Sequence, residues 1–229
     1  MLILGIDTSG KSGGVTLADG DEHSFRVYES AAIAGGTFSA QLVPTVAEVL
    51  ARHGFKARDL EGFAVASGPG SFTGLRVGLS AVKALAETLH RPIATVSLLE
   101  VLASFAEAGG PVAAVMEAGR GELFVGIYFV QSNRQGVACV DESLRTPGEL
   151  LQELRTDAHP TVITCDEPVA QWAGSMGFVV LRAPRPDSER IAQLGLKKLL
   201  RGETVAPETL DANYLRRSDA EIFFPGVKA

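Results

Sequence analysis

The segment SGPGSFTGLRVG, residues 67–78, joins an apolar strand to a helix, and its pattern sets the expected fold of the first half of the chain. Residues 63–66 before it form a short apolar run typical of a buried strand, and residues 73–90 after it have the spacing of an amphipathic helix. The five residues SGPGS between them are typical turn formers. The stretch therefore predicts a strand, a tight turn and a helix in direct succession.

Two roles are open for this glycine-rich joint. Its backbone amides at a helix N-terminus would suit an anion, whereas the alternative is a tight structural turn. The spacing is GxGxxxG, one residue off the dinucleotide-binding fingerprint, and Ser71 does not lie in GxSxG, so neither a Rossmann site nor a hydrolase elbow is supported. We favour the structural role. The residues of this structural motif are Gly68, Pro69, Gly70, Ser71, Thr73, Gly74 and Gly78.

Two glycines lie four residues apart inside the predicted helix. Gly74 and Gly78 each cost about 1 kcal/mol relative to alanine in a helix interior. Close approach of another helix or strand, either within the same lobe or across a subunit contact, would offset that cost. Leu75, Leu79 and Val82 form a second, apolar face. We expect one side of this helix to meet the sheet and the other to meet a partner.

The element pattern extends outward from this joint to the whole chain. A hairpin turn is expected at Asp19-Gly20, and from Pro111 the order βββαβαβα of the first half starts again. Thr146 and Glu149 are typical of a capping box that opens a helix in the second half. The strands are predicted at residues 2–6, 15–17, 25–28, 63–66, 93–96, 112–116, 123–130, 137–140, 161–165 and 179–181, and the helices at 41–53, 73–90, from 97, from 147, 169–175 and 187–201.

Two copies of one element order indicate a duplicated α/β fold of two lobes. We divide the chain into a first lobe, residues 1–108, which carries the partner-binding helices, and a second, smaller lobe, residues 109–229. The second lobe ends in an irregular tail that we expect to pack back on the first lobe. Its apolar residues 222–224 are the expected docking element.

The composition narrows the classes of function. The 229 residues are 46% hydrophobic, and 21 Lys and Arg against 27 Asp and Glu give a net charge of −6, without the basic field of a nucleic-acid binder. If the protein acts on RNA, a partner is expected to hold the RNA.

The N-terminus has no basic leader, and its apolar run stops at Asp7, far short of the roughly 20 residues of a membrane span. We therefore expect a cytoplasmic protein. Cys139 and Cys165 have no CxxC spacing, which predicts two buried, reduced thiols.

Residues 5–12, GIDTSGKS, match the Walker A pattern GxxxxGK[ST], but their context differs from that of a phosphate-binding loop. Such a loop must lead into a helix, whereas here Val15 and Thr16 continue into a strand. We predict a hairpin tip with Asp7 at its root. Asp7 leaves nucleotide binding open as an alternative, because actin-like and sugar-kinase-like ATPases use that position near phosphate and metal.

The spacing of the histidines does not support a metal centre. His23, His53, His90 and His159 form no HxxxH or HExxH motif, so no metal ligands are assigned and a metalloprotease is unsupported. Residues 116–122, MEAGRGE, place two carboxylates around an arginine in a tight turn. We favour local ion pairing there over an acid/base pair.

The central motif closely resembles the bacterial TsaB family, also called YeaZ. It is preceded by LGIDTS and followed by ATVSLLEVLA, and the resemblance continues through QLVPTVAEVL and RGELFVGIY to Tyr214-Leu215-Arg216, so it covers nearly the whole chain. The resemblance implies an α/β fold of two tandem RNase H-like lobes of the actin, sugar-kinase and heat-shock ATPase type, each with a mixed sheet and flanking helices.

The resemblance also implies a function. Members of the family are non-catalytic subunits that support threonylcarbamoyl transfer to N6 of the adenosine beside the tRNA anticodon. The related TsaD carries the active site, and TsaE supplies an ATPase. We thus expect a TsaD-like partner, a TsaE-like partner, a homodimer when the chain is alone, only indirect contact with tRNA, and no cofactor on this chain, with ATP and metal on the partner subunits. Phe38 and Gly119 depart from the family pattern, which leaves in question any role tied to those positions.

The family's partner surface would lie on the two helices of the first lobe. Two other functions are alternatives to this one: a stand-alone actin-fold ATPase or small-molecule kinase, and a metalloprotease. The ATPase or kinase would need a glycine-rich strand-to-helix turn, which residues 111–201 lack. The partner-interface residues that the resemblance implies are Gln41, Leu42, Thr45 and Val49 on one helix and Leu75, Arg76, Leu79 and Lys83 on the other.

Overall fold

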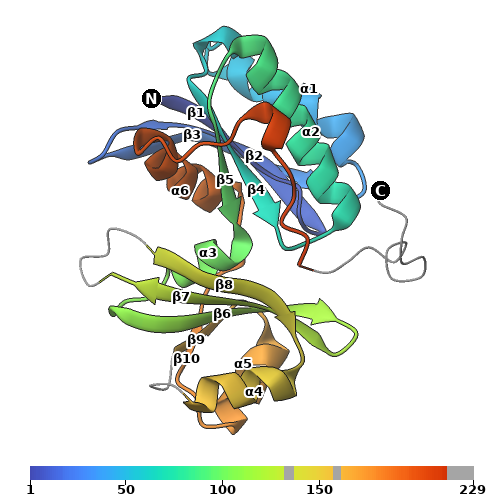
Figure 1. The fold of residues 1–229 in the computed structure, drawn as a ribbon. Coiled ribbons are helices and arrows are strands. Elements are labelled where there is room, and N and C mark those ends of the chain that lie inside the picture. The colour runs from blue at the N-terminus through green and yellow to red at the C-terminus, as the bar shows by residue number, and fades with distance from the viewer. Residues whose placement is uncertain (132–136, 157–160, 216–229) are drawn as a thin grey trace. The chain divides into compact units, whose positions relative to one another are not determined.

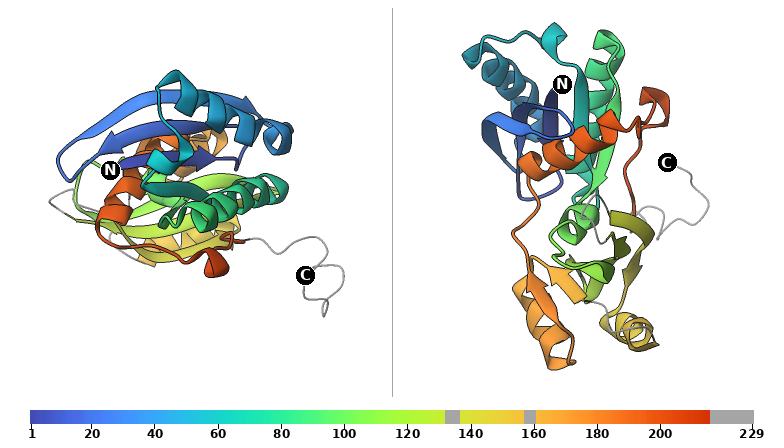
Figure 2. Two further views of the ribbon diagram at one scale, coloured as in Figure 1. Left: turned by 90° about the horizontal axis from the view of Figure 1, so that it is seen from above. Right: turned by 90° about the vertical axis from the view of Figure 1, so that its left-hand side faces the viewer.

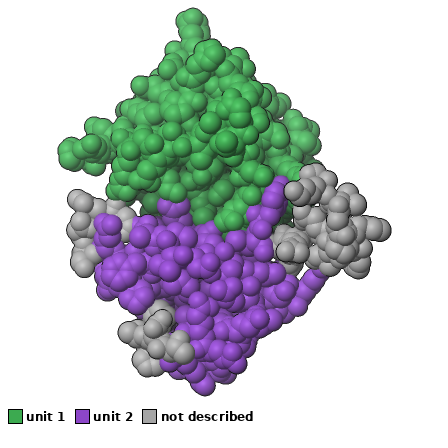
Figure 3. Space-filling model, in the orientation of Figure 1, with its two compact units in different colours: residues 1–98, 186–213 green, residues 99–185, 214–229 purple. Residues whose placement is uncertain are grey.

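The computed structural model describes residues 1–131, 137–156 and 161–215, and the chain divides into two compact units (Figure 3). Unit 1 contains Met1–Leu98 and Pro186–Asn213, and unit 2 contains Leu99–Arg185 and the segment from Tyr214 onward. Each unit is built around one five-stranded sheet. None of the helices in the described part of the chain has the length and apolar character that a membrane span requires.

The sheet of unit 1 has the strand order β3-β2-β1-β4-β5. β1, β2 and β3 form an antiparallel meander, and β4 and β5 run parallel to β1. The strands are β1 (Leu2–Asp7), β2 (Ser12–Gly20), β3 (Phe25–Ala34), β4 (Gly62–Gly68) and β5 (Ile93–Ser97), and a short 3-10 helix, η1 (Ala57–Asp59), precedes β4.

Helices cover both faces of this sheet (Figure 1, Figure 2). α1 (Phe38–Arg52) and α2 (Phe72–Leu89) lie side by side on one face, and α6 (Ser188–Leu200) lies on the other. Because side chains alternate along a strand, Leu4 and Ile6 of β1 join the core under α1 and α2, whereas Ile3 packs with Ala192 of α6. The central strand is therefore buried on both faces, as its continuous apolar run indicates.

Unit 2 repeats this architecture. Its strand order is β8-β7-β6-β9-β10, so that β6 to β10 take the places that β1 to β5 have in unit 1. Again the first three strands are antiparallel and the last two run parallel to the first. This repetition confirms the predicted order βββαβαβα and the two-lobed α/β fold. The elements are β6 (Gly110–Gly119), β7 (Glu122–Val130), β8 (Val137–Arg145), α4 (Pro147–Thr156), β9 (Thr161–Thr164), α5 (Glu167–Ser175) and β10 (Val180–Arg182).

α4 and α5 pack on one face of the second sheet, and α3 (Leu98–Ala103) packs on the other (Figure 1). Gly126 of β7 makes the α3 contact possible, because a Cβ there would lie 3.0 Å from Leu99 Cβ. The predicted capping box of α4 is present, with the Thr146 amide donating to the Glu149 carboxylate at 2.7 Å and the Glu149 amide donating to the Thr146 hydroxyl at 3.3 Å.

The residues of the two compact units differ from the expected lobes 1–108 and 109–229, because α3 falls almost entirely in unit 2 and α6 in unit 1. Ala192 and Leu196 of α6 pack against Ile3 and Ala94 of the first sheet. Helical periodicity identifies the apolar face of α6, but either sheet offers a comparable apolar surface. The sequence pattern alone therefore could not assign α6 to a lobe.

The beginning of the expected C-terminal tail runs along unit 1. The Val205 amide donates to Ile93 O at 2.9 Å, the 3-10 helix η2 (Pro207–Thr209) follows, and the Asn213 amide donates to Ser67 O at 2.7 Å. Residues 222–224, the expected docking element, lie outside the described residues.

The first hairpin turn differs from the prediction at Asp19-Gly20. Both residues belong to β2, and the turn follows at Asp21, whose carboxylate accepts hydrogen bonds from the backbone amides of His23 and Ser24 at 2.8 and 2.9 Å. Such bonds let an aspartate close a turn without a glycine. They also lower the pKa of Asp21.

Candidate interface on the paired helices

The joint between β4 and α2 is held by hydrogen bonds within the protein. The Ser71 hydroxyl caps α2 by accepting from the Gly74 amide at 3.2 Å, and the Ser71 amide donates to Ser9 O at 2.7 Å. Gly68 has a φ of +122°, a backbone conformation that residues other than glycine rarely adopt. The Ser71 amide therefore donates within the protein and is not directed at an anion. This supports the structural role of the motif over an anion-binding site.

The two glycines of α2 face the end of β1. A Cβ at Gly74 would overlap the carbonyl oxygen of Thr8, and one at Gly78 would overlap the Thr8 hydroxyl. That hydroxyl donates to Gly74 O at 2.8 Å. The close approach left open by the sequence therefore occurs within unit 1, between α2 and Thr8.

The Walker-like segment forms a hairpin, as predicted. β1 ends at Asp7 and β2 begins at Ser12, so the segment leads into a strand and not into a helix. Gly5 lies within β1, where a Cβ would come within 2.6 Å of Ala192 Cβ, so its role is to let α6 pack closely. Asp7 is buried, and its carboxylate accepts from the Ser9 amide at 2.8 Å. Gly5, the first glycine of the Walker-like pattern, thus allows α6 to pack closely against β1.

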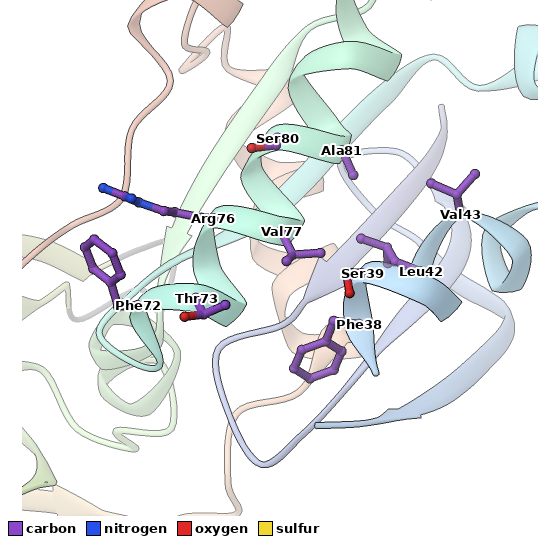
Figure 4. A pocket seen from close by; sticks show the side chains of 10 residues that line it. All are labelled: Phe38, Ser39, Leu42, Val43, Phe72, Thr73, Arg76, Val77, Ser80 and Ala81. Atoms are coloured by element: carbon purple, nitrogen blue, oxygen red, sulfur yellow. The ribbon is translucent and has the colours of Figure 1, made fainter. Parts of the chain in front are cut away.

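α1 and α2 leave an open groove between their N-terminal halves, with a volume of about 510 Å³ (Figure 4). Val43 from α1 and Phe72 from α2 are exposed apolar side chains, with 58% and 38% of their surface accessible. Exposed apolar side chains that line one groove are typical of a surface that another molecule covers. The groove is lined by Phe38, Ser39, Leu42, Val43, Phe72, Thr73, Arg76, Val77, Ser80 and Ala81.

The groove lies on the two helices expected to carry the partner surface, but half of the expected contact residues are buried in the core. Leu42, Val49, Leu75 and Leu79 are at most 6% exposed and belong to the core of unit 1, although Leu42 also lines the groove. The apolar stripe of each helix covers the sheet first, because that burial stabilises the lobe itself.

The other four expected residues lie nearer the surface. Gln41 and Arg76 are exposed, and Thr45 and Lys83 are half-buried. Phe72 and Val43 line the groove but are not among the expected residues, and both are apolar residues outside the core-facing stripes of their helices. An apolar residue off the stripe is the signal that would have identified them.

Comparisons with known proteins agree with this fold. The family model "TsaD: tRNA N6-adenosine threonylcarbamoyltransferase" matches residues 32–171. The tRNA threonylcarbamoyladenosine biosynthesis protein TsaB of Bacillus subtilis is 30% identical over 233 residues, with 96% of each chain covered. The chain belongs to the TsaB (YeaZ) family.

Two further relatives support this membership. TsaB of Escherichia coli is 27% identical over 194 residues, covering 81% of this TsaB-family chain and 84% of the relative. A crystal structure from Pseudomonas aeruginosa, described as an uncharacterized protein with similarity to peptidase YEAZ, matches with a TM-score of 0.70 and 25% identity, covering 94% of this chain and 99% of that one.

The polar residues singled out in the TsaB-family sequence have local structural roles. His53 Nε2 lies 2.9 Å from the Glu29 carboxylate, and His90 ends α2 in a left-handed conformation. His159 lies outside the described residues. Within residues 1–131, 137–156 and 161–215, no three His, Cys, Asp or Glu side chains come together as a metal site would require.

The predicted turn between β6 and β7 is present. Gly119, Arg120 and Gly121 all have positive φ, and the Glu117 amide donates to the Asp166 carboxylate at 2.8 Å. The cysteines differ from the prediction of two buried thiols, because Cys139 is exposed on the edge strand β8.

Cys165 is only partly buried, and this burial raises the pKa of its thiol. A raised pKa disfavours the thiolate, the form in which cysteine attacks. The net effect of this environment therefore disfavours Cys165 as a nucleophile, although the charge of Arg185 opposes it.

Proposed function

We propose that this TsaB-family chain is a non-catalytic platform subunit in threonylcarbamoyladenosine biosynthesis. It binds a TsaD-like transferase through the groove between α1 and α2, and so supports transfer of the threonylcarbamoyl group to N6 of the adenosine beside the tRNA anticodon. The observation that carries this proposal is the open, apolar groove on the helix pair, in a chain whose relatives are named for this pathway.

The groove has the character of a surface for a protein helix. Its walls come from two helices, and the α2 side includes the small residues Ser80 and Ala81. Small side chains let a docking helix approach closely. An interface of ordinary size would remove about 800 Å² of each partner from water, with a few aromatic, apolar or arginine anchors supplying most of the affinity.

The proposal assigns the chemistry to other subunits. ATP and metal belong to the TsaD-like transferase and a TsaE-like ATPase. The net charge of −6 favours a chain that contacts tRNA only through its partner. The complex would act in the cytoplasm. Calorimetry of the isolated chain with ATP and magnesium is expected to give no binding. Micromolar affinity for ATP would instead support the alternative function of a stand-alone ATPase or kinase with Asp7 at its nucleotide site.

The test is complex formation between this chain and the TsaD-like transferase of the same organism. We expect a stable complex of the two purified proteins, measured by analytical ultracentrifugation and calorimetry. Val43→Asp should weaken it at least about 30-fold, because it places a charge in the apolar contact. Self-association of the chain alone, the expected homodimer, is measured in the same runs.

Val179→Asp is the matched control. Val179 is 68% exposed in unit 2, comparable with the 58% of Val43, so the same substitution there should leave binding and thermal stability unchanged. Wild-type affinity in a folded Val43→Asp variant would show that the groove is not the contact surface.

A further inference from the structure

β8 forms one edge of the second sheet, and no other strand in the described part of the chain pairs with its outer side (Figure 1). Its register with β7 shifts once, which leaves Val140 as an extra, bulged residue, and from Asp141 to Arg145 the register is continuous. Residues 137–145 contain neither proline nor lysine, which edge strands commonly use to prevent pairing with another chain. Residues 141–145 are therefore a regular segment at which such pairing can occur.

Two opposite charges are placed symmetrically on this segment. Asp141 and Arg145 lie two residues on either side of Ser143, and side chains two apart in a strand share a face. Asp141 pairs with Ile127 of β7 and Arg145 with Leu123, and both of these residues belong to or pack against the core under α4 and α5. The two charges therefore point to the same face of the sheet.

The charged groups still have hydrogen-bonding capacity. Arg145 Nε donates to the Glu153 carboxylate at 3.2 Å, and its Nη2 donates to Asp141 Oδ2 at 3.1 Å. The Ser143 hydroxyl donates to the same Oδ2 at 2.8 Å. Among the described residues, neither Arg145 Nη1 nor Asp141 Oδ1 has a hydrogen-bond partner. Since the Asp141 side chain is 49% exposed and a guanidinium has five donors, a second ion pair can form on each side chain.

We propose that the outer side of β8 pairs with β8 of a second copy of this chain, antiparallel and centred on Ser143. In a twofold-symmetric antiparallel pair, residues at equal distances from the centre face each other. Asp141 of each copy then lies opposite Arg145 of the other, with Cβ atoms about 5 Å apart, and two ion pairs form between the copies. Glu142 faces Leu144, so no like charges are opposed.

The charges select both the register and the occupant. A centre at Glu142 or at Asp141 would set that carboxylate against its own copy, which is unfavourable, and a centre at Leu144 would leave both charges without an opposite charge. A different protein would need both charges at the same spacing, whereas a second copy supplies them by symmetry.

The expected dimer is weak, and it does not depend on the proposed function. Two short strand segments bury less than the roughly 800 Å² per partner of an ordinary interface. The segment 141–145 shares no residue with the groove between α1 and α2. Loss of this dimer would therefore leave the proposed contact with the transferase untested and unchanged.

The experiment measures self-association of the full chain by sedimentation velocity, from micromolar to near-millimolar concentration. Asp141→Arg and Arg145→Asp each replace two ion pairs by two like-charge contacts, and each should weaken self-association by about 10-fold or more. An equimolar mixture of the two variants should associate about as tightly as wild type, because the introduced charges then face each other and so do the native ones. Arg155→Asp makes the same charge change at an exposed position of α4 and is the matched control, which should behave as wild type.

Cross-linking tests the register without any change of charge. Residues facing each other across an antiparallel pair have Cα atoms about 5 Å apart, within the range of a disulfide. In a Cys139→Ser background, mild oxidation should therefore link two copies that carry Ser143→Cys. Copies that carry Ser175→Cys, at an exposed position of α5, should stay unlinked.

The outcomes separate this contact from other roles of the same residues. A wild-type chain that stays monomeric over the whole range overturns the inference. A mixture of the two charge variants that associates no better than either alone does the same, because it would show that Asp141 and Arg145 act only within one chain. If Val43→Asp abolishes self-association and the charge reversals do not, the copies meet through the groove and β8 is not the interface.

Discussion

Replacing Gly5 with alanine tests the packing of α6 on the first sheet. Gly5 is the residue of the Walker-like pattern that lies inside β1, and a Cβ there would come within 2.6 Å of both Ala192 Cβ and Ser188 O. Ordinary contacts of this kind are about 1 Å longer. Because neither atom is the end of a flexible side chain, α6 must move away from the sheet.

The expected cost follows from these contacts. Overpacking a tight core costs about 1–3 kcal/mol, and the two rigid neighbours place Gly5→Ala at the upper end of this range. Replacing a strand glycine by alanine returns up to about 1 kcal/mol through the unfolded state. The net destabilisation is about 2 kcal/mol, which in a chain of 229 residues lowers the melting temperature by about 4–8 °C.

Thermal denaturation followed by circular dichroism measures this shift, and Gly174→Ala provides the control. Gly174 lies in α5, and a Cβ there would meet nothing within 4 Å, so alanine should raise the melting temperature of the protein by about 2–4 °C. A Gly5→Ala protein that melts at or above the wild-type temperature would refute the close packing of α6.

Two further predictions concern α1 and α2. Ser71→Ala removes the N-cap of α2 and should cost about 1 kcal/mol, seen as a drop of about 2–4 °C in melting temperature, whereas Ser71→Asp, which can still cap, should melt near the wild type. Glu29 should contribute stability that depends on pH. The Arg52 guanidinium, with a smaller contribution from His53, holds the pKa of Glu29 below its ordinary value against the opposing effect of desolvation. Because the folded-state pKa is lowered, this stabilisation is present above the unfolded-state pKa of glutamate and is lost as pH falls through the folded-state pKa. Urea denaturation between pH 3 and 7 should therefore show a smaller loss of stability on acidification for Glu29→Gln than for wild type, and equal losses would contradict the role of Glu29.

The amino-acid sequence by itself determined the element order and most of the local signals. The apolar run of β1 and the capping box at Thr146 and Glu149 depend on residues that are neighbours along the chain. Their residue types and spacing are therefore sufficient to predict them. The repeat of βββαβαβα could be predicted for the same reason, because each copy is a succession of such local patterns.

Only the tertiary structure decided what covers each apolar surface. Periodicity marks the inward stripe of α6 but not the sheet it meets, and Ala192 against Gly5 settles that choice through contact between residues far apart in the chain. The same reason explains the candidate site. Leu42 and Leu79 are apolar residues on the expected helices, yet they are buried in the core of unit 1, while Val43 and Phe72 remain exposed. Which apolar residues serve the core and which remain for a partner depends on how elements distant in sequence pack, and no local pattern contains that information.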